Sequence, residues 1–235
     1  MALDVIAHRG ASGTRPENTL AAFRRAVELG AHMIELDVQC TRDGAVVVIH
    51  DDTLERTTDG RGIVRHHTLT ELASLDAGGW FDPAYAGERL PTLDAVLAAV
   101  PIPINVELKS AGDDGLERRT LEVVEAAGAL QRVVFSSFAA DSLVRMRALS
   151  AAAELAVLWD RTAMAGALRL AEGVGARALH IRTGRSAPSG IASGHAAGLL
   201  VRVWTVNARA DFTPLQEAGV DGVFTDYPER FLLDG

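Results

Sequence analysis

Short apolar segments alternate with longer amphipathic segments along most of this chain, and such a pattern is compatible with few architectures. The apolar segments predict strands at 3–7, 104–108, 133–136, 155–158, 178–181, 200–205 and 222–224, with a further strand beginning at 33. The amphipathic segments predict helices at 92–100, 116–127, 141–149, 163–172, 188–197, 209–217 and 228–232, after a first helix that ends at Gly30. Strands that alternate with helices in this way form parallel sheets.

Eight strand–helix units in 235 residues indicate a single α/β domain, a (β/α)8 TIM barrel spanning residues 1–235. The alternative is a doubly wound open sheet. Such a sheet usually carries a glycine-rich dinucleotide-binding turn after its first strand, which the segment RGASG at 9–13 does not supply. We therefore expect a closed barrel.

Residues 52–91 interrupt the alternation after the second strand. This stretch contains glycines and a proline in turn-like positions and shows no long helical period. A long segment of this kind inside a strand–helix chain predicts a small insertion within the barrel domain. Its aromatic residues Trp80, Phe81 and Tyr85 are candidates to bind an acyl chain.

Charge and cysteine content exclude several classes of partner. The net charge of −8 argues against nucleic acid or an anionic membrane. The single cysteine, Cys40, rules out an internal disulfide and fits a reducing compartment. No signal peptide is visible, and no apolar run approaches the roughly 18 residues of a membrane span. We expect a cytoplasmic protein without stable membrane association. The sequence is compatible with a homo-oligomer.

The strand that begins at 33 carries a strong chemical signal. Glu35 and Asp37 are two residues apart and therefore share one face of the strand. The Asp-Gly sequence at 43–44 predicts a two-residue hairpin turn, which would place Asp37 opposite His50 on the returning strand. Two carboxylates beside an imidazole would form a metal site with an acid/base group next to it.

Other polar side chains fall at the ends of predicted strands, where TIM barrels carry their active sites. His8 and Arg9 follow the first strand, and Glu107 and Lys109 end the third. Two further rim segments are WTVN at 204–207 and TDY at 225–227. We expect these side chains to gather at one rim of the barrel.

The charges of the rim residues indicate their roles. Three carboxylates are expected there: Glu35, Asp37 and Glu107. They would repel one another unless they bound a hard cation, Mg2+ or Ca2+, and no Cys/His set suggests zinc. His8 and His50 can transfer protons near neutral pH, while Arg9 and Lys109 can bind an oxyanion such as phosphate. Together these groups indicate phosphoester cleavage.

Structural roles remain open for some of these residues. His8 could be a hydrogen-bonded rim residue, and Lys109 could pair with Glu107 or Asp37 in the absence of substrate. We expect Glu17 to cap the first helix rather than to bind anything. The remaining histidines are expected to take no part in the chemistry: His32, His66, His67, His180 and His195. Among them, the role of His180, at a strand end, is the most open.

Several motifs occur in order along the chain: HRG at 8–10, PENT at 16–19, ELD at 35–37, HD at 50–51, RTT at 56–58, VELK at 106–109, WTVN at 204–207 and DGVFTDYP at 221–228. Nearly end to end, the chain resembles the glycerophosphodiester phosphodiesterase family. The resemblance implies a phosphatidylinositol-phospholipase-C-like barrel with its insertion at 52–91. It also implies the following site: a divalent cation bound by Glu35, Asp37 and Glu107, His8 and His50 as general acid and base, Arg9 and Lys109 as phosphate ligands, and Trp204 as a wall for the glycerol moiety.

The expected activity is metal-dependent hydrolysis of small-molecule glycerophosphodiesters to sn-glycerol 3-phosphate and an alcohol. The sequence is compatible both with attack by water and with a cyclic phosphate intermediate. It does not indicate which histidine is the base. One alternative is a lysophospholipase D or related phosphodiesterase on the same scaffold. Another is a non-catalytic barrel that binds phosphodiesters, which the loss of a ligand or a histidine would favour. The Gly/Ser-rich segment 182–193, where a helix is expected, could alter selectivity for the alcohol.

Overall fold

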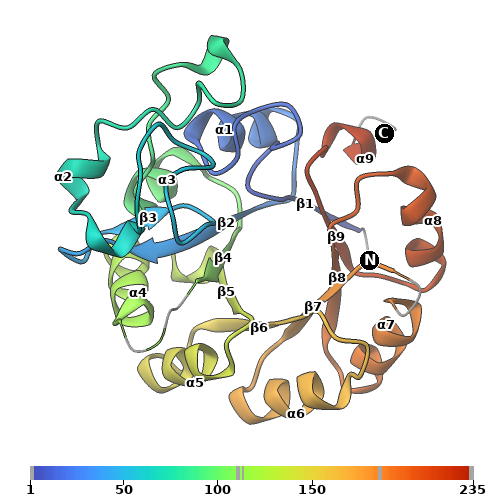
Figure 1. Ribbon diagram of the computed structural model, residues 1–235. Coiled ribbons are helices and arrows are strands. Elements are labelled where there is room, and N and C mark those ends of the chain that lie inside the picture. The colour runs from blue at the N-terminus through green and yellow to red at the C-terminus, as the bar shows by residue number, and fades with distance from the viewer. Residues whose placement is uncertain (1–2, 110–111, 113, 185–186, 233–235) are drawn as a thin grey trace.

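Parallel strands form a closed barrel in the computed structural model, which describes residues 3–109, 112, 114–184 and 187–232 (Figure 1). The barrel strands are β1 (Asp4–Ala7), β2 (Met33–Cys40), β4 (Ile104–Leu108), β5 (Val133–Ser137), β6 (Glu154–Trp159), β7 (Ala178–Arg182), β8 (Leu200–Trp204) and β9 (Gly222–Thr225). Each pairs in parallel with its neighbours, and the pairing of β1 with both β2 and β9 closes the ring. The predicted (β/α)8 TIM barrel is confirmed, and the open sheet is excluded.

Helices surround the barrel and connect its strands (Figure 1). They are α1 (Leu20–Glu28), α3 (Leu93–Ala99), α4 (Leu116–Ala126), the short 3-10 helix η3 (Leu130–Arg132), α5 (Ala140–Leu149), α6 (Ala165–Val174), α7 (Ala187–Ala196), α8 (Arg209–Glu217) and α9 (Glu229–Leu232). In the described ranges, no helix combines the length and apolar character needed to cross a membrane.

The alternating side chains of the strands divide the core into two layers. Inward-facing apolar side chains fill part of the barrel interior: Ile6, Met33, Val134, Ala156, Ala178 and Phe224. Outward-facing residues such as Leu36 belong to the larger apolar cluster, together with helix residues such as Phe23 and Leu93. The inward positions nearer the carboxyl ends of β2 and β4 carry polar side chains instead, so the strands that build the core also present the candidate site.

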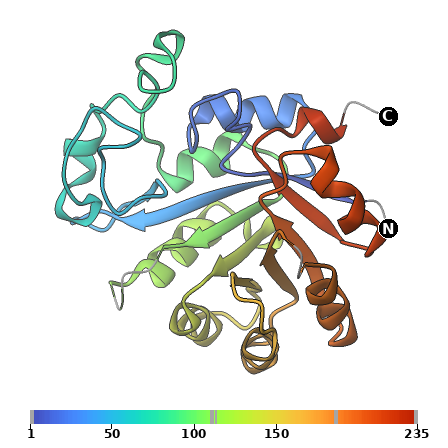
Figure 2. The ribbon, with the colours of Figure 1, turned by 45° about the vertical axis from the view of Figure 1, so that its right-hand side comes forward.

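Residues 52–91, which we interpret as the insertion, contain little regular structure. They hold η1 (Val64–His66), α2 (Leu69–Leu72) and η2 (Pro83–Tyr85). A small apolar cluster joins this segment to the strand that precedes it: Val47, Ile49, Leu54, Val64, Leu72 and Leu90. Figure 2 shows the segment beside the far end of β2, to the left of the barrel.

The hairpin register predicted from the Asp-Gly sequence is wrong by one residue. β3 (Val46–Val48) runs antiparallel to β2 with Cys40 opposite Val46, so the turn has three residues and ends at Gly44, whose φ is 83°. Because a three-residue turn favours a final residue in the left-handed region, this glycine fits the longer turn. Asp37 therefore pairs with Ile49, whose amide donates to the Asp37 carbonyl at 3.0 Å, and not with His50.

Candidate active site

Three carboxylates converge at the carboxyl ends of two neighbouring strands. Asp37 on β2 lies opposite Glu107 on β4, and Glu35 precedes Asp37 by two residues, so all three point into the barrel. One oxygen from each lies within 4.8 Å of the others. Glu35 and Asp37 are almost fully buried. The sequence prediction of this acidic cluster therefore agrees with the geometry.

The acidic cluster is electrostatically strained. Burial and the nearby Asp37 charge raise the pKa of Glu35 to about 8, and the same two causes raise the pKa of Glu107. Burial also opposes ionisation of Asp37, but the charges of Arg9, His50 and Lys109 outweigh it and hold the pKa of Asp37 below its usual value. Buried Asp37 Oδ1 has no hydrogen-bond partner within the described residues. An all-oxygen, multiply charged donor set with an unsatisfied oxygen fits a hard divalent cation.

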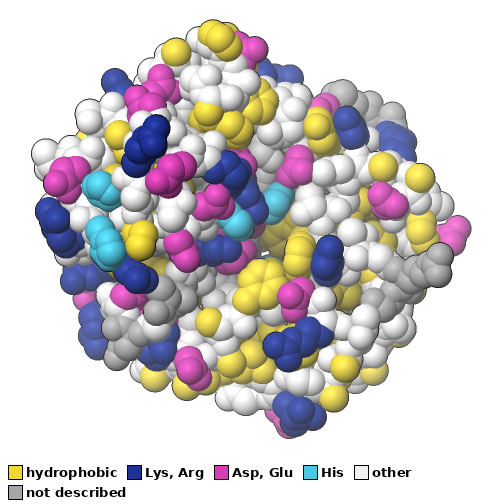
Figure 3. Space-filling view, in the orientation of Figure 1, with side chains coloured by type: hydrophobic (Ala, Val, Ile, Leu, Met, Phe, Trp, Pro, Cys, Tyr) yellow, Lys and Arg dark blue, Asp and Glu magenta, His cyan; other side chains and the backbone are white. Residues whose placement is uncertain are grey.

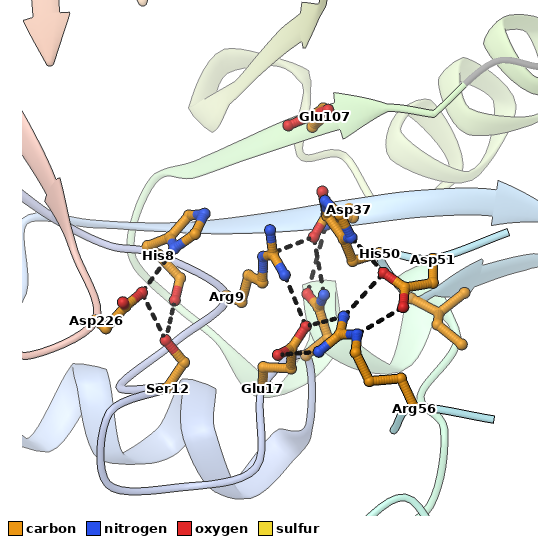
Figure 4. Close-up of polar contacts among 12 residues, drawn as sticks. His8, Arg9, Ser12, Glu17, Asp37, His50, Asp51, Arg56, Glu107 and Asp226 are labelled. Atoms are coloured by element: carbon orange, nitrogen blue, oxygen red, sulfur yellow. Dashed lines mark hydrogen bonds and ion pairs between the residues drawn. The ribbon is translucent and has the colours of Figure 1, made fainter. Parts of the chain in front are cut away.

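His8 is held by a carboxylate from the other end of the chain. Its Nδ1 lies 2.7 Å from Asp226 Oδ1, in the loop after β9 (Figure 4). Asp226 is itself held by the Ser12 hydroxyl at 3.1 Å and by the Asn207 amide at 2.6 Å. Burial opposes the charged form of His8, but the hydrogen bond to Asp226 and the charge of Glu35 outweigh it, so the pKa of His8 is raised.

His50 has a comparable arrangement with the opposite result. Its Nδ1 lies 2.6 Å from Asp51 Oδ1. Burial is the largest influence on His50, and with the positive charges of Arg9 and Lys109 it outweighs the carboxylates, so the pKa of His50 is lowered. The two histidines line the same pocket and differ in their affinity for a proton.

The two basic side chains of the predicted site are paired with its carboxylates. Arg9 Nη1 donates to Glu17 at 2.8 Å, and its Nε lies 3.4 Å from Asp37 Oδ2. Lys109 Nζ lies 3.0 Å from Glu107 and 3.9 Å from Asp37. Both basic side chains also line the pocket. Each is therefore accessible to a bound ligand while it is paired with a carboxylate.

Glu17 does not cap the first helix, and this prediction is wrong. The N-cap of α1 is Thr19, whose hydroxyl accepts from the Ala22 amide at 3.3 Å. Glu17 instead accepts hydrogen bonds from Arg9 and from both terminal nitrogens of Arg56, the latter at 2.8 and 2.9 Å. The positive φ of Asn18, 57°, turns the chain at this point, so that Glu17 lies outside the helix.

A cavity of about 90 Å³ lies at the centre of these groups. Its polar lining is His8, Arg9, Glu35, His50, Asn105, Glu107 and Lys109, and its apolar lining is Phe138, Leu158, Trp204 and Phe224. Trp204 packs edge to face with Phe138, with ring centroids 5.6 Å apart. Figure 3 shows charged and histidine side chains on one side of a central hollow and hydrophobic side chains on the other.

Sequence reasoning missed the groups that hold the predicted residues in place. Asp226, Ser12 and Asn207 hold His8, while the Asn18 amide donates to Asp37 Oδ2 at 2.9 Å. Asp226 and Asn207 lie in segments that the sequence places at the rim, and this position was the signal that could have identified them as partners of the site. Phe138 was missed because an isolated aromatic residue after a strand carries no recognisable pattern.

His180 lies outside the cavity lining. The ring is fully buried against Phe224, with centroids 4.9 Å apart, and burial lowers its pKa well below the usual value. Neither ring nitrogen has a hydrogen-bond partner within the described residues. That His180 takes no part in the chemistry stays a prediction.

The fold and the site define a TIM barrel whose carboxyl rim gathers three carboxylates, two histidines and two basic side chains around one cavity. A family-level comparison matches residues 8–230 to the glycerophosphoryl diester phosphodiesterase family. A glycerophosphodiester phosphodiesterase of Caldanaerobacter subterraneus is 39% identical over 97% of this chain and 96% of its own length. The chain belongs to the glycerophosphoryl diester phosphodiesterase family, and it is a phosphoric diester hydrolase, as its motifs predicted.

Solved structures agree with this assignment. An Oleispira antarctica phosphodiesterase, determined with its product sn-glycerol-3-phosphate, superposes with a TM-score of 0.89 at 34% identity, covering 99% of this chain and 97% of the other. A glycerophosphodiester phosphodiesterase from Agrobacterium tumefaciens superposes with a TM-score of 0.83 at 28% identity, covering 99% of this chain and all of the other.

Proposed function

We propose that this enzyme hydrolyses small glycerophosphodiesters to sn-glycerol 3-phosphate and an alcohol, with a bound divalent cation, Mg2+ or Ca2+. The observation that carries the proposal is the convergence of three carboxylates and two carboxylate-bound histidines on one cavity. The product bound to the Oleispira antarctica relative supports sn-glycerol 3-phosphate as the shared product.

Glu35, Asp37 and Glu107 would hold the cation, since they form the buried oxygen cluster described above. When bound there, the cation would supply Lewis-acid stabilisation of phosphodiester charge. Arg9 and Lys109 line the same cavity and would contact the phosphate oxygens, neutralising the charge of the bound phosphodiester. Trp204 and Phe138 would form the apolar wall beside the glycerol moiety.

The two histidines would divide the proton transfers. Because the pKa of His8 is raised and that of His50 is lowered, His8 holds a proton at a pH where His50 is neutral. We therefore propose His50 as the base that deprotonates the nucleophile and His8 as the acid that protonates the leaving alcohol oxygen. Both hydrogen bonds to carboxylates use Nδ1, which leaves each Nε2 for these transfers.

The lysophospholipase alternative gains no support from the insertion. Phe81 packs edge to face against Trp80 and Tyr85, and none of these three aromatic residues belongs to the cavity lining. We keep glycerophosphodiesters without acyl chains as the proposed substrates.

An assay with purified protein tests the proposal directly. Release of sn-glycerol 3-phosphate is followed with glycerophosphocholine, glycerophosphoethanolamine and glycerophosphoglycerol, each with and without EDTA. Release of choline is followed in parallel with lysophosphatidylcholine, because cleavage of that substrate leaves a lysophosphatidate instead of sn-glycerol 3-phosphate. We expect turnover of the deacylated substrates, its loss in EDTA, and its return on adding excess Mg2+ or Ca2+. Full activity in EDTA would remove the cation from the proposal, and a preference for lysophosphatidylcholine would replace the substrate class.

A further inference from the structure

A continuous chain of ion pairs connects Arg9 with His50 and passes through Arg56 (Figure 4). Arg9 Nη1 lies 2.8 Å from Glu17, which lies 2.8 and 2.9 Å from the two terminal nitrogens of Arg56. Arg56 Nη2 in turn lies 2.9 Å from Asp51, and its Nε contacts the second oxygen of the same carboxylate. Asp51 holds His50 Nδ1. One guanidinium therefore binds two carboxylates that each hold a residue of the proposed site.

The chemistry of this junction suits arginine in particular. The planar guanidinium makes two-point contacts with both Glu17 and Asp51, and all three of its nitrogens are used. A lysine ammonium is a compact point charge and cannot reproduce this arrangement. The Arg56 side chain is 43% exposed, whereas the Glu17 side chain is 14% exposed. The carboxylates behind Arg56 are thus more sheltered from solvent than the arginine itself.

Arg56 belongs to the insertion, whereas Glu17 belongs to the loop between β1 and α1. A second contact joins the same two segments, because the Arg15 guanidinium lies 5.4 Å from the centre of the Tyr85 ring. Within the insertion, the neighbouring Leu54 is buried in the small apolar cluster and its carbonyl accepts from the Thr58 hydroxyl at 2.7 Å. The insertion therefore has a packed core that fixes the position of Arg56.

We propose that Arg56 is a positioning residue, which holds the phosphate-binding Arg9 and the proton-transferring His50 in register through Glu17 and Asp51. The inference rests on the proposed function. It assigns the insertion a part in catalysis, although Arg56 acts through two carboxylates and does not contact the substrate. The branch through Glu17 holds Arg9, and the branch through Asp51 holds His50. Because the two branches act on different groups, kinetics can separate their effects.

Three variants separate the two branches, each replacing a charged side chain with an uncharged one. Glu17→Gln loosens Arg9, so we expect KM to rise about tenfold with kcat changed by less than about threefold. Asp51→Asn loosens His50, so we expect kcat to fall about tenfold or more with KM nearly unchanged. Arg56→Gln removes the junction, so we expect both changes in one variant, and Arg56→Lys should recover little because it cannot form both two-point contacts.

Arg65→Gln is the matched control. Arg65 is an exposed arginine of the same insertion and makes no ion pair within the described residues. We expect wild-type kcat and KM from this variant. Thermal melts of all variants establish that each is folded, and steady-state kinetics with glycerophosphocholine provide the comparison.

The outcomes distinguish the possibilities. A rise in KM for Glu17→Gln, a fall in kcat for Asp51→Asn and both for Arg56→Gln support the positioning role. If wild-type protein is active and Arg56→Gln matches Arg65→Gln, the inference is overturned. It is also overturned if all three variants lose kcat equally in step with a lower melting temperature, because that result means a purely structural role. A wild-type protein without glycerophosphodiesterase activity overturns the proposed function and the inference with it.

Discussion

His8 and His50 show how side chains of one type acquire different properties from their neighbours. Each binds an aspartate through Nδ1, and each lines the same cavity. Burial acts against charge on both, but Glu35 adds to the effect of Asp226 on His8, while Arg9 and Lys109 oppose the carboxylates around His50. The pKa of His8 therefore lies above the ordinary value and that of His50 below it, which is the split an acid and a base require.

Asp226→Asn tests this split. The proposed acid must be protonated, so activity is lost as pH rises through the pKa of His8. The hydrogen bond to Asp226 and the charge of Asp226 both raise the pKa of His8, so removing that charge lowers it. We expect the alkaline limb of the kcat/KM profile to move to lower pH, with a loss of at least about tenfold at pH 8. The acidic limb, set by His50, should stay in place.

A second histidine–aspartate pair provides the control for this variant. His195 Nε2 lies 2.8 Å from Asp221 Oδ2, and neither residue lines the cavity. Asp221→Asn should leave both limbs of the profile unmoved. An unchanged alkaline limb in Asp226→Asn would contradict the assignment of His8 as the acid.

The hairpin formed by β2 and β3 links local backbone geometry to the site. Its turn ends at Gly44 with a φ of 83°, and the register set there puts Asp37 opposite Ile49. His50 follows directly, beyond the end of β3, where it can turn toward the cavity. A turn of two residues would have shifted every partner of the returning strand.

Gly44→Ala should destabilise the fold, because a residue with a Cβ is strained at this positive φ. A Cβ there would also collide with the Arg119 guanidinium and displace that side chain. We expect the free energy of unfolding to fall by about 1–2 kcal/mol in urea denaturation. Gly173→Ala lies in α6, where an added Cβ would have no atom within 4 Å, and it should instead raise the free energy of unfolding by about 0.5–1 kcal/mol. If both variants changed the free energy of unfolding in the same direction, the strain argument would be contradicted.

The barrel as a whole stores unfavourable electrostatic energy at its carboxyl rim. Pairing of β2 with β4 places Glu35, Asp37 and Glu107 together, and burial raises the pKa of Glu35 to about 8. A ligand that binds only the folded state and relieves this repulsion must stabilise the fold. Binding should weaken as pH falls below about 8, because the cation then competes with the Glu35 proton.

Mg2+ or Ca2+ should therefore raise the thermal midpoint of the protein. At a concentration about 100 times the Kd, linkage gives about 2.7 kcal/mol, or roughly 5–10 °C for a chain of this size. Differential scanning calorimetry at pH 8, with and without the cation, measures the shift. Glu107→Gln should remove most of it, and an unchanged midpoint for the wild-type protein at millimolar cation would contradict the proposed metal site.

Much of the fold was accessible from sequence because its signals are local. Strand and helix periods, including that of the Gly/Ser-rich α7, predicted the barrel, and alternation along β2 and β4 predicted which acidic residues face inward. Motif resemblance added the family and its expected site. The Asp-Gly signal misled because both two- and three-residue turns use it, and the difference of one residue depends on pairing along the whole hairpin.

Residue types and their spacing were thus sufficient for the architecture and for the groups that meet at its rim. The partners of those groups were not, because Asp226 reaches His8 across 218 residues and Arg56 reaches Glu17 across 39. Contacts of that range depend on closure of the barrel and packing of the insertion, which bring distant loops to one point. The opposed pKa shifts of His8 and His50 depend on the same closure, since they arise from burial and from charges that only the folded chain assembles.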